Sequence, residues 1–159
     1  MKFAKKEFLD YWKMIKAPVY VLVAWSVLGL IFGLVSFSLY ASIFSPLAGW
    51  ILIIAAFSFI GWSAVKDHHQ PLNIAAWSGA LAGAIYGFAS AVISILMFYL
   101  VPEIIKAAIS QAAQAGANAA AIESFMAIGI YIGLVTGPLI SAVIGAIIAS
   151  ITAMIAKKV

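Results

Sequence analysis

The chain has 159 residues, of which 66% are hydrophobic and 9% are charged, with a net charge of +4 and a mean hydropathy of +1.16. A soluble domain is about half apolar and about a quarter charged, so this composition excludes a soluble globular domain and predicts a chain solvated mainly by lipid. The absence of cysteine excludes disulfides, thiolate metal sites and iron–sulfur clusters, and the absence of arginine disfavours nucleotide or nucleic-acid binding.

Residues 1–17 are predicted to form an amphipathic cytoplasmic helix. Phe8, Tyr11 or Trp12, and Ile15 recur at helical spacing between lysine and acidic side chains. A lysine-rich helix with an apolar face is suited to the lipid headgroup surface. Two roles stay open for this segment: a topogenic anchor, or recognition of anionic lipids or of a partner.

Four apolar stretches are each long enough to cross a bilayer, which needs about 20 residues. They are residues 19–40, 47–65, 74–101 and 125–156, and their interiors contain no Asp, Glu, Lys or His. We therefore expect residues 1–159 to form a single membrane domain, an all-α integral membrane protein with four transmembrane helices in a bundle.

Lysine distribution predicts the orientation of these spans. Eight of the nine lysines flank one side, at the two chain ends and at Lys66, whereas Lys106 stands alone on the other side. The excess of positive charge on cytoplasmic loops predicts a multi-pass protein of the cell membrane with both termini in the cytoplasm.

The segment 102–124, between the third and fourth spans, is alanine-rich and is predicted to be helical. Pro102 suits the first position of a helix, and Asn118 suits a cap before a helix that continues into the fourth span. A helix over about residues 119–157 would be roughly 58 Å long, well beyond the ~30 Å hydrocarbon layer. Two arrangements stay open: an extended external hairpin between the third and fourth spans, or a helix lying flat on the membrane.

Small residues recur at every fourth position in three of the spans. This spacing places them on one helix face, where a smooth strip typical of a glycine zipper lets a neighbouring helix approach closely in lipid. The predicted helix-packing residues are Gly29, Gly33, Gly79, Gly83, Gly87, Gly129, Gly133, Gly137, Ser141 and Gly145. The strips predict either close pairing of the third and fourth spans or formation of an oligomer, and leucine at Gly83 or Gly133 is expected to disrupt folding or assembly.

Two further features carry weaker hypotheses. Pro138 lies inside the fourth span, where a kink is expected; the kink either frees a carbonyl for an ion or a hinge, or is satisfied by neighbouring groups. His68 and His69 lie in the loop KDHHQPLN and supply two imidazoles, which fit a pH-sensitive or metal-binding loop less well than a solvated turn.

The sequence predicts no catalytic residue, metal site or cofactor. We expect a non-enzymatic accessory or assembly subunit whose partners are membrane lipids and either further copies of itself or other membrane subunits. Two alternatives stay open: an oligomeric channel or transporter for a small neutral solute, and a protein that binds lipids or isoprenoids. No motif in the sequence identifies a protein family.

Overall fold

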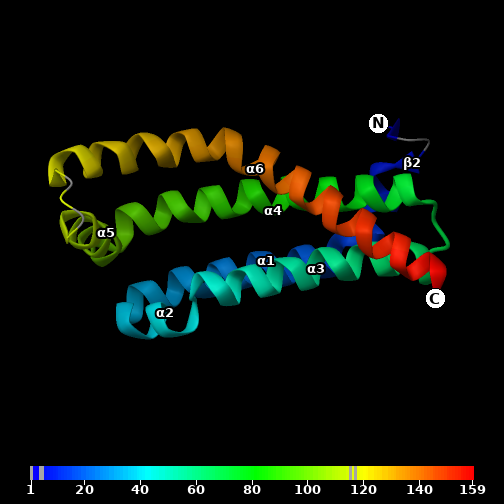
Figure 1. Ribbon diagram of the computed structural model, residues 1–159, viewed down its shortest axis with the longest axis horizontal. Coiled ribbons are helices and arrows are strands. Elements are labelled where there is room, and N and C mark those ends of the chain that lie inside the picture. Colours follow the sequence, from blue (N-terminus) through cyan, green and yellow to red (C-terminus); the bar gives the residue numbers. More distant parts are fainter. Residues whose placement is uncertain (1, 4–5, 115, 117) are drawn as a thin grey trace.

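The computed structural model describes residues 2–3, 6–114, 116 and 118–159, and these residues form a bundle of long helices (Figure 1). Four helices are long and apolar enough to cross a membrane. They run over Phe8–Val35 (α1), Pro46–Lys66 (α3), Leu72–Leu100 (α4) and, within the longer α6, Ser124–Lys158. Apart from two short strands near the N-terminus, the described residues are helical, and the chain is a multi-pass membrane protein, as its composition predicts.

The N-terminal segment differs from the expected interfacial helix. Two short antiparallel strands, β1 (Lys2–Phe3) and β2 (Lys6–Glu7), precede α1. Helix α1 then runs without a break through Pro18, and Tyr11 and Ile15 are buried in the bundle core. The apolar face that was expected to meet lipid is therefore packed against the protein, and no helix boundary separates it from the first span.

Helix α1 ends earlier than expected, at Val35, and the chain turns at Ser36 into the short α2 (Phe37–Ile43). Helix α3 then starts where a proline is favourable, with Pro46 in its first turn and the Ser45 hydroxyl accepting a hydrogen bond of 3.3 Å from the Ala48 amide. The first span is therefore shorter than expected at its end, and a sharp turn and a second short helix lie between α1 and α3.

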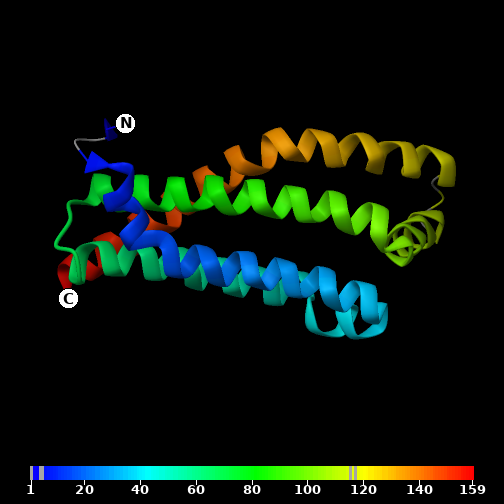
Figure 2. The ribbon, with the colours of Figure 1, turned by 180° about the vertical axis from the view of Figure 1, so that it is seen from behind.

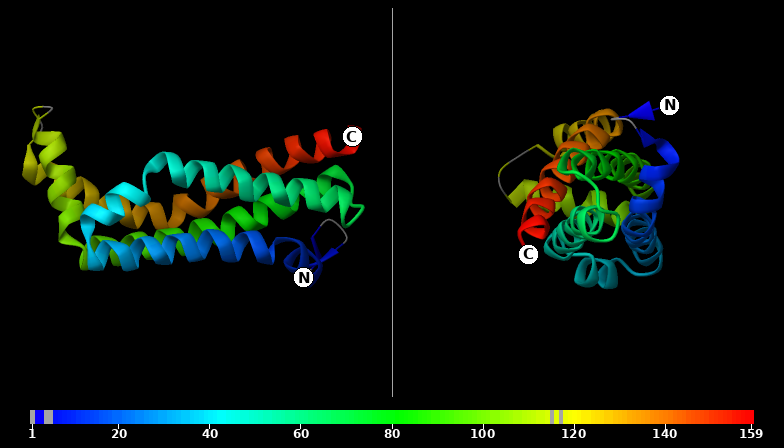
Figure 3. Two further views of the ribbon diagram at one scale, coloured as in Figure 1. Left: turned by 90° about the horizontal axis from the view of Figure 1, so that it is seen from below. Right: turned by 90° about the vertical axis from the view of Figure 1, so that its right-hand side faces the viewer.

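Helices α5 (Pro102–Gln114) and α6 (Ala119–Lys158) occupy the predicted external segment and the fourth span. Figure 3 shows that α5 does not continue the axis of α4 but crosses the end of the bundle at a steep angle. Helix α6 instead runs without a break from Ala119 into the fourth span. Of the two sides of the expected hairpin, only α6 therefore extends a membrane-spanning helix. The tip QAGAN lies partly outside the described residues, since residues 115 and 117 are not among them.

The four long helices lie side by side, with both chain ends and the α3–α4 loop at one end of the bundle and α2 and α5 at the other (Figures 1 and 2). We call these the termini end and the α5 end. Helix α6 crosses α4 and packs against both α4 and α3, and α1 packs on the opposite side of α4. The core is centred on Ile15, Leu22, Phe57 and Ile60, toward the termini end.

Candidate functional site

Helices α4 and α6 make the most extensive contact in the bundle, and they make it through small residues. Gly79, Gly83 and Gly87 are all buried on one face of α4. A Cβ added at Gly79 would overlap the Gly145 carbonyl oxygen, and one added at Gly83 would overlap that of Ser141. At Gly87 it would lie 2.7 Å from the Gly137 carbonyl oxygen. We call this contact the α4–α6 seam; it comprises Gly79, Gly83, Gly87, Gly137, Ser141 and Gly145.

A second close contact joins α3 to α6 at the termini end. A Cβ at Gly61 would overlap the backbone carbonyl of Ala149, and Ala149 itself is fully buried. No pattern in the sequence singles out Gly61, because Phe57 and Val65, its neighbours four residues away, are large and form no strip. A lone glycine opposite a strip on another helix is visible only once the two helices are placed together.

Gly29 and Gly33, in contrast, meet side chains and no helix backbone. A Cβ at Gly29 would lie 3.3 Å from Cδ1 of Phe44, and one at Gly33 would lie 3.4 Å from Cγ2 of Val101. The absence of a side chain at Gly29 thus makes room for the ring that follows α2. These two glycines shape side-chain packing within the α1, α2 and α4 region.

Toward the α5 end, the strip of small residues on α6 faces open space. A Cβ at Gly129 or Gly133 would meet no described atom within 4 Å. Between α4 and α6 lies a groove of about 480 Å³, which we call the α4–α6 groove. Its lining consists of Gly87, Ser90, Ala91, Ser94, Met126, Gly129, Ile130, Gly133, Gly137 and Ser141.

The groove opens where α6 bends. Figure 1 shows α6 changing direction between its orange part, which runs beside α4, and its red part, which crosses toward α3. Pro138 lies in this stretch and has no N–H to donate to the Leu134 carbonyl, the usual cause of a helix kink. Thr136 donates a hydrogen bond of 3.1 Å to the Ile132 carbonyl one turn earlier, as hydroxyls at helix bends often do.

A polar contact also links α4 and α6 near the groove. The Tyr99 hydroxyl on α4 and the Tyr131 hydroxyl on α6 are 2.7 Å apart, within hydrogen-bonding distance, although both side chains are exposed. At the seam the backbones of α4 and α6 lie in close contact, whereas here the helices are far enough apart for two tyrosine side chains to meet between them. This hydrogen bond is a side-chain link between α4 and α6.

Loss of this bridge is expected to cost little stability. Tyr99→Phe and Tyr131→Phe should each lower the free energy of unfolding by about 0.6 kcal/mol and at most ~1.7 kcal/mol, the range for hydrogen bonds between membrane helices. Reversible unfolding in mixed micelles measures the effect, with Tyr20→Phe on α1 as the control. The double variant should cost no more than either single one; fully additive losses would show that the two hydroxyls act independently.

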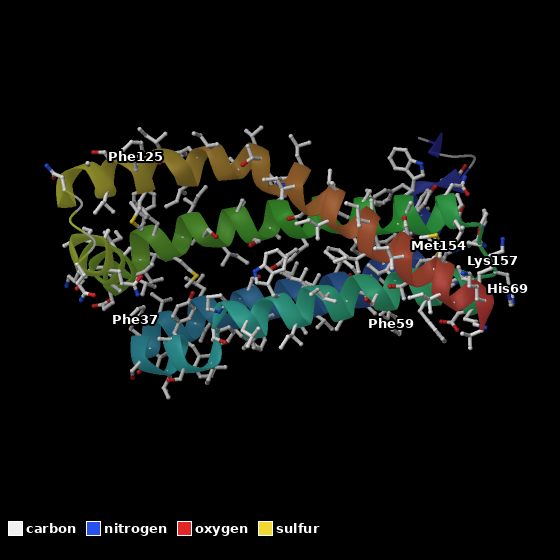
Figure 4. The ribbon with its side chains drawn as sticks, in the orientation of Figure 1. Phe37, Phe59, His69, Phe125, Met154 and Lys157 are labelled. Carbon is white, nitrogen blue, oxygen red and sulfur yellow. The ribbon has the colours of Figure 1, made fainter. Side chains whose placement is uncertain are left out.

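His68 and His69 lie at the termini end, away from the seam and the groove. The Gln70 side-chain amide donates to the His68 carbonyl, and His69 adopts a positive φ of 50°. His69 and Lys157 line a shallow hollow of about 440 Å³ between the loop and the end of α6 (Figure 4). Within the described part of the chain, no three or more His, Cys, Asp or Glu side chains gather as a metal site would require.

The seam and the groove offer contact surfaces and hydroxyl groups. The groove lining contains glycine, alanine, methionine, isoleucine and serine side chains and carries no charged group among the described residues. Acid–base or nucleophilic catalysis would need a nucleophile with a base within hydrogen-bonding reach. The arrangement is suited to packing an apolar partner.

Neither a protein-family model, nor a curated protein, nor a solved structure matches this chain.

Proposed function

We propose that this protein is a non-catalytic accessory or assembly subunit that receives a transmembrane helix of a partner in the α4–α6 groove. The observation that carries the proposal is that only one part of the small-residue strip on α6 packs against the other helices of the chain. Its part near the termini end is packed against α4 and α3, whereas Gly129 and Gly133 face open space. The small-residue strip of α6 thus packs within the monomer over one part of its length. It continues at the same spacing to Gly129 and Gly133, where no described residue covers it.

Small residues are effective on such a face because lipid supplies no hydrophobic driving force between helices. Helix association in a bilayer depends on van der Waals contact at close approach, which glycine and serine permit. Within the chain this is how Gly83 meets Ser141. A second helix lying against Gly129 and Gly133 would make the same kind of contact on the same face of α6.

The proposed setting is the cell membrane, with both termini in the cytoplasm. The two chain ends and the α3–α4 loop share one end of the bundle (Figure 1). Lys66, Lys157 and Lys158 lie on these segments, whereas Lys106 lies on α5 at the other end. The excess of lysine at the termini end supports a cytoplasmic location for that end.

The assembly role is tested by Gly133→Leu. We expect the wild-type protein to be extracted in mild detergent as a complex, and the variant to be extracted as a monomer at normal abundance. A Cβ at Gly133 meets no described atom within 4 Å, so leucine there would occupy the groove while the close contacts of Gly79 and Gly83 stay intact. Native mass spectrometry measures the composition of each species. Val135→Leu, at a 66% exposed position on the same helix, is the matched control and should leave the complex intact.

The composition of the complex distinguishes between partners. A second copy of this chain and a different membrane subunit would both support the proposal, since either supplies a transmembrane helix. A wild-type monomer carrying only lipid or isoprenoid would contradict it and favour the lipid-binding alternative. An unchanged complex in Gly133→Leu would show that the groove is not the contact.

A further inference from the structure

A second, smaller cavity of about 210 Å³ lies on the α1 and α3 side of α4, toward the α5 end. It is partly open to the surroundings and is lined by residues of α1, α3 and α4, together with α2 and the residues that follow it. Its polar lining consists of Ser26, Tyr40, Ser45, Tyr86, Ser90 and Ser94. No charged side chain among the described residues lines it, so an ion would lose its hydration without a compensating charge.

Two of these serines have hydroxyls without a hydrogen-bond partner among the described residues. Elsewhere in the helices, Ser78 and Ser150 donate to the carbonyl four residues earlier, at 2.8 and 2.6 Å. Ser26 does the same toward Leu22 at 3.2 Å. Ser90 and Ser94 make no hydrogen bond to any described residue, although each can donate one and accept two. Their hydroxyls therefore remain available to a molecule in the cavity.

Aromatic rings form the opposite, apolar wall. The Phe44 ring lies 4.5 Å from that of Trp25 and 5.7 Å from that of Tyr40, measured between centroids. Gly29 lets this cluster approach α1, because a Cβ there would lie 3.3 Å from Phe44. The cavity thus combines hydroxyls from α4 with an aromatic surface from α1 and the α2 region.

We infer that this cavity binds a small uncharged molecule that carries a hydroxyl or carbonyl group on an apolar body. The polar group hydrogen-bonds to Ser90 and Ser94, and the apolar body packs against Trp25 and Phe44. The volume matches about seven water molecules at ~30 Å³ each and is smaller than the ~300–1,000 Å³ of sites for drug-sized ligands. The ligand class is therefore that of short-chain alcohols, amides and ketones.

This site is independent of the proposed assembly role. Ser90 and Ser94 also line the α4–α6 groove, so the two spaces meet at these serines. A partner helix in the groove would approach these serines from the side of α6, whereas the ligand lies on the side of α1 and α3. Binding is expected whether or not a partner is present.

Photolabelling of the full chain with 3-azibutanol, a diazirine-bearing short-chain alcohol, tests the inference. We expect saturable labelling of peptides from α1, α3 and α4 that line the cavity, reduced by excess n-butanol and mapped by mass spectrometry. The double variant Ser90→Ala and Ser94→Ala should weaken labelling about three- to tenfold, since it removes two hydrogen-bonding groups at membrane depth. Ser150→Ala, which removes a hydroxyl on α6 far from the cavity, should label as the wild type.

A space-filling variant tests the same site without touching its hydroxyls. A Cβ at Gly49 meets no described atom within 4 Å, and Gly49 lines the cavity, so Gly49→Leu should abolish the labelling while the bundle stays folded. Non-saturable labelling spread over lipid-facing residues would overturn the inference. So would wild-type labelling in both the double serine variant and Gly49→Leu.

Discussion

Gly83→Ala is expected to destabilise the bundle by about 1–3 kcal/mol, the usual cost of forcing an extra methyl group into a filled contact. The added Cβ would overlap the Ser141 carbonyl oxygen and lie 2.9 Å from Cα of Ala142, so the backbones of α4 and α6 would have to separate. Backbone atoms cannot turn aside as the end of a flexible side chain can. Gly83→Leu is expected to prevent accumulation of the folded protein.

The matched control is Gly133→Ala, the same substitution on the other part of the small-residue surface. Its Cβ would meet no described atom within 4 Å, and alanine is the better helix former, so the monomer should keep its stability or gain up to about 1 kcal/mol. Unfolding of both variants in mixed micelles, at a dilution where the wild type is monomeric, measures the difference. Equal destabilisation by the two alanines would contradict the division of the strip into a packed and an open part.

The length and composition of the spans predict the four membrane helices, but not which face of each helix meets protein. On α4 the four-residue spacing of Gly79, Gly83 and Gly87 marks the face that lies against α6, because α4 is straight where the two helices meet. On α6 the same spacing continues through Gly129 and Gly133, yet these residues lie away from α4. Spacing defines a face, and a bend decides how much of that face one neighbour can reach.

The N-terminal segment is a second case in which residue spacing alone does not predict the packing. The spacing of Phe8, Tyr11 and Ile15 predicts an apolar helix face but does not say what covers it. In the structure, Tyr11 and Ile15 are buried, because the helix passes through Pro18 and keeps its face aligned with the core of the bundle. The predicted segment 1–17 and the predicted span 19–40 meet at Pro18, but a proline can stay within a membrane helix when its neighbours satisfy the freed carbonyl.

The cavity serines show a third limit. Ser90 and Ser94 lie in an apolar span rich in alanine and serine, and no motif marks them. The cavity that they line also depends on α1, α3 and the Phe44 ring. Phe44 follows the short helix α2, which the sequence did not predict. A cavity forms only when the helices are packed together, so the residues that line it can be identified only from the fold.

Pro138→Ala is expected to widen the α4–α6 groove and to break the hydrogen bond between Tyr99 and Tyr131. Alanine restores the amide donor to the Leu134 carbonyl, so the bend in α6 should straighten. The part of α6 near the termini is fixed by the contacts of Gly145 and Ala149, and the straightened helix would carry its other half away from α4. A bend of ~20° acting over about ten residues, or ~15 Å, moves Ile128 by about 5 Å.

Spin labels can measure this movement cleanly, because the chain has no native cysteine. Cysteine at Leu96 on α4 and at Ile128 on α6, which are 43% and 58% exposed, would carry the two labels on lipid-facing positions. Electron paramagnetic resonance should give a label separation about 5 Å longer in Pro138→Ala than in the parent, while Leu139→Ala, the neighbouring exposed position, should leave it unchanged. An unchanged distance in Pro138→Ala would show that the seam and the tyrosine bridge hold α6 bent without the proline, and the groove would then be a consequence of packing.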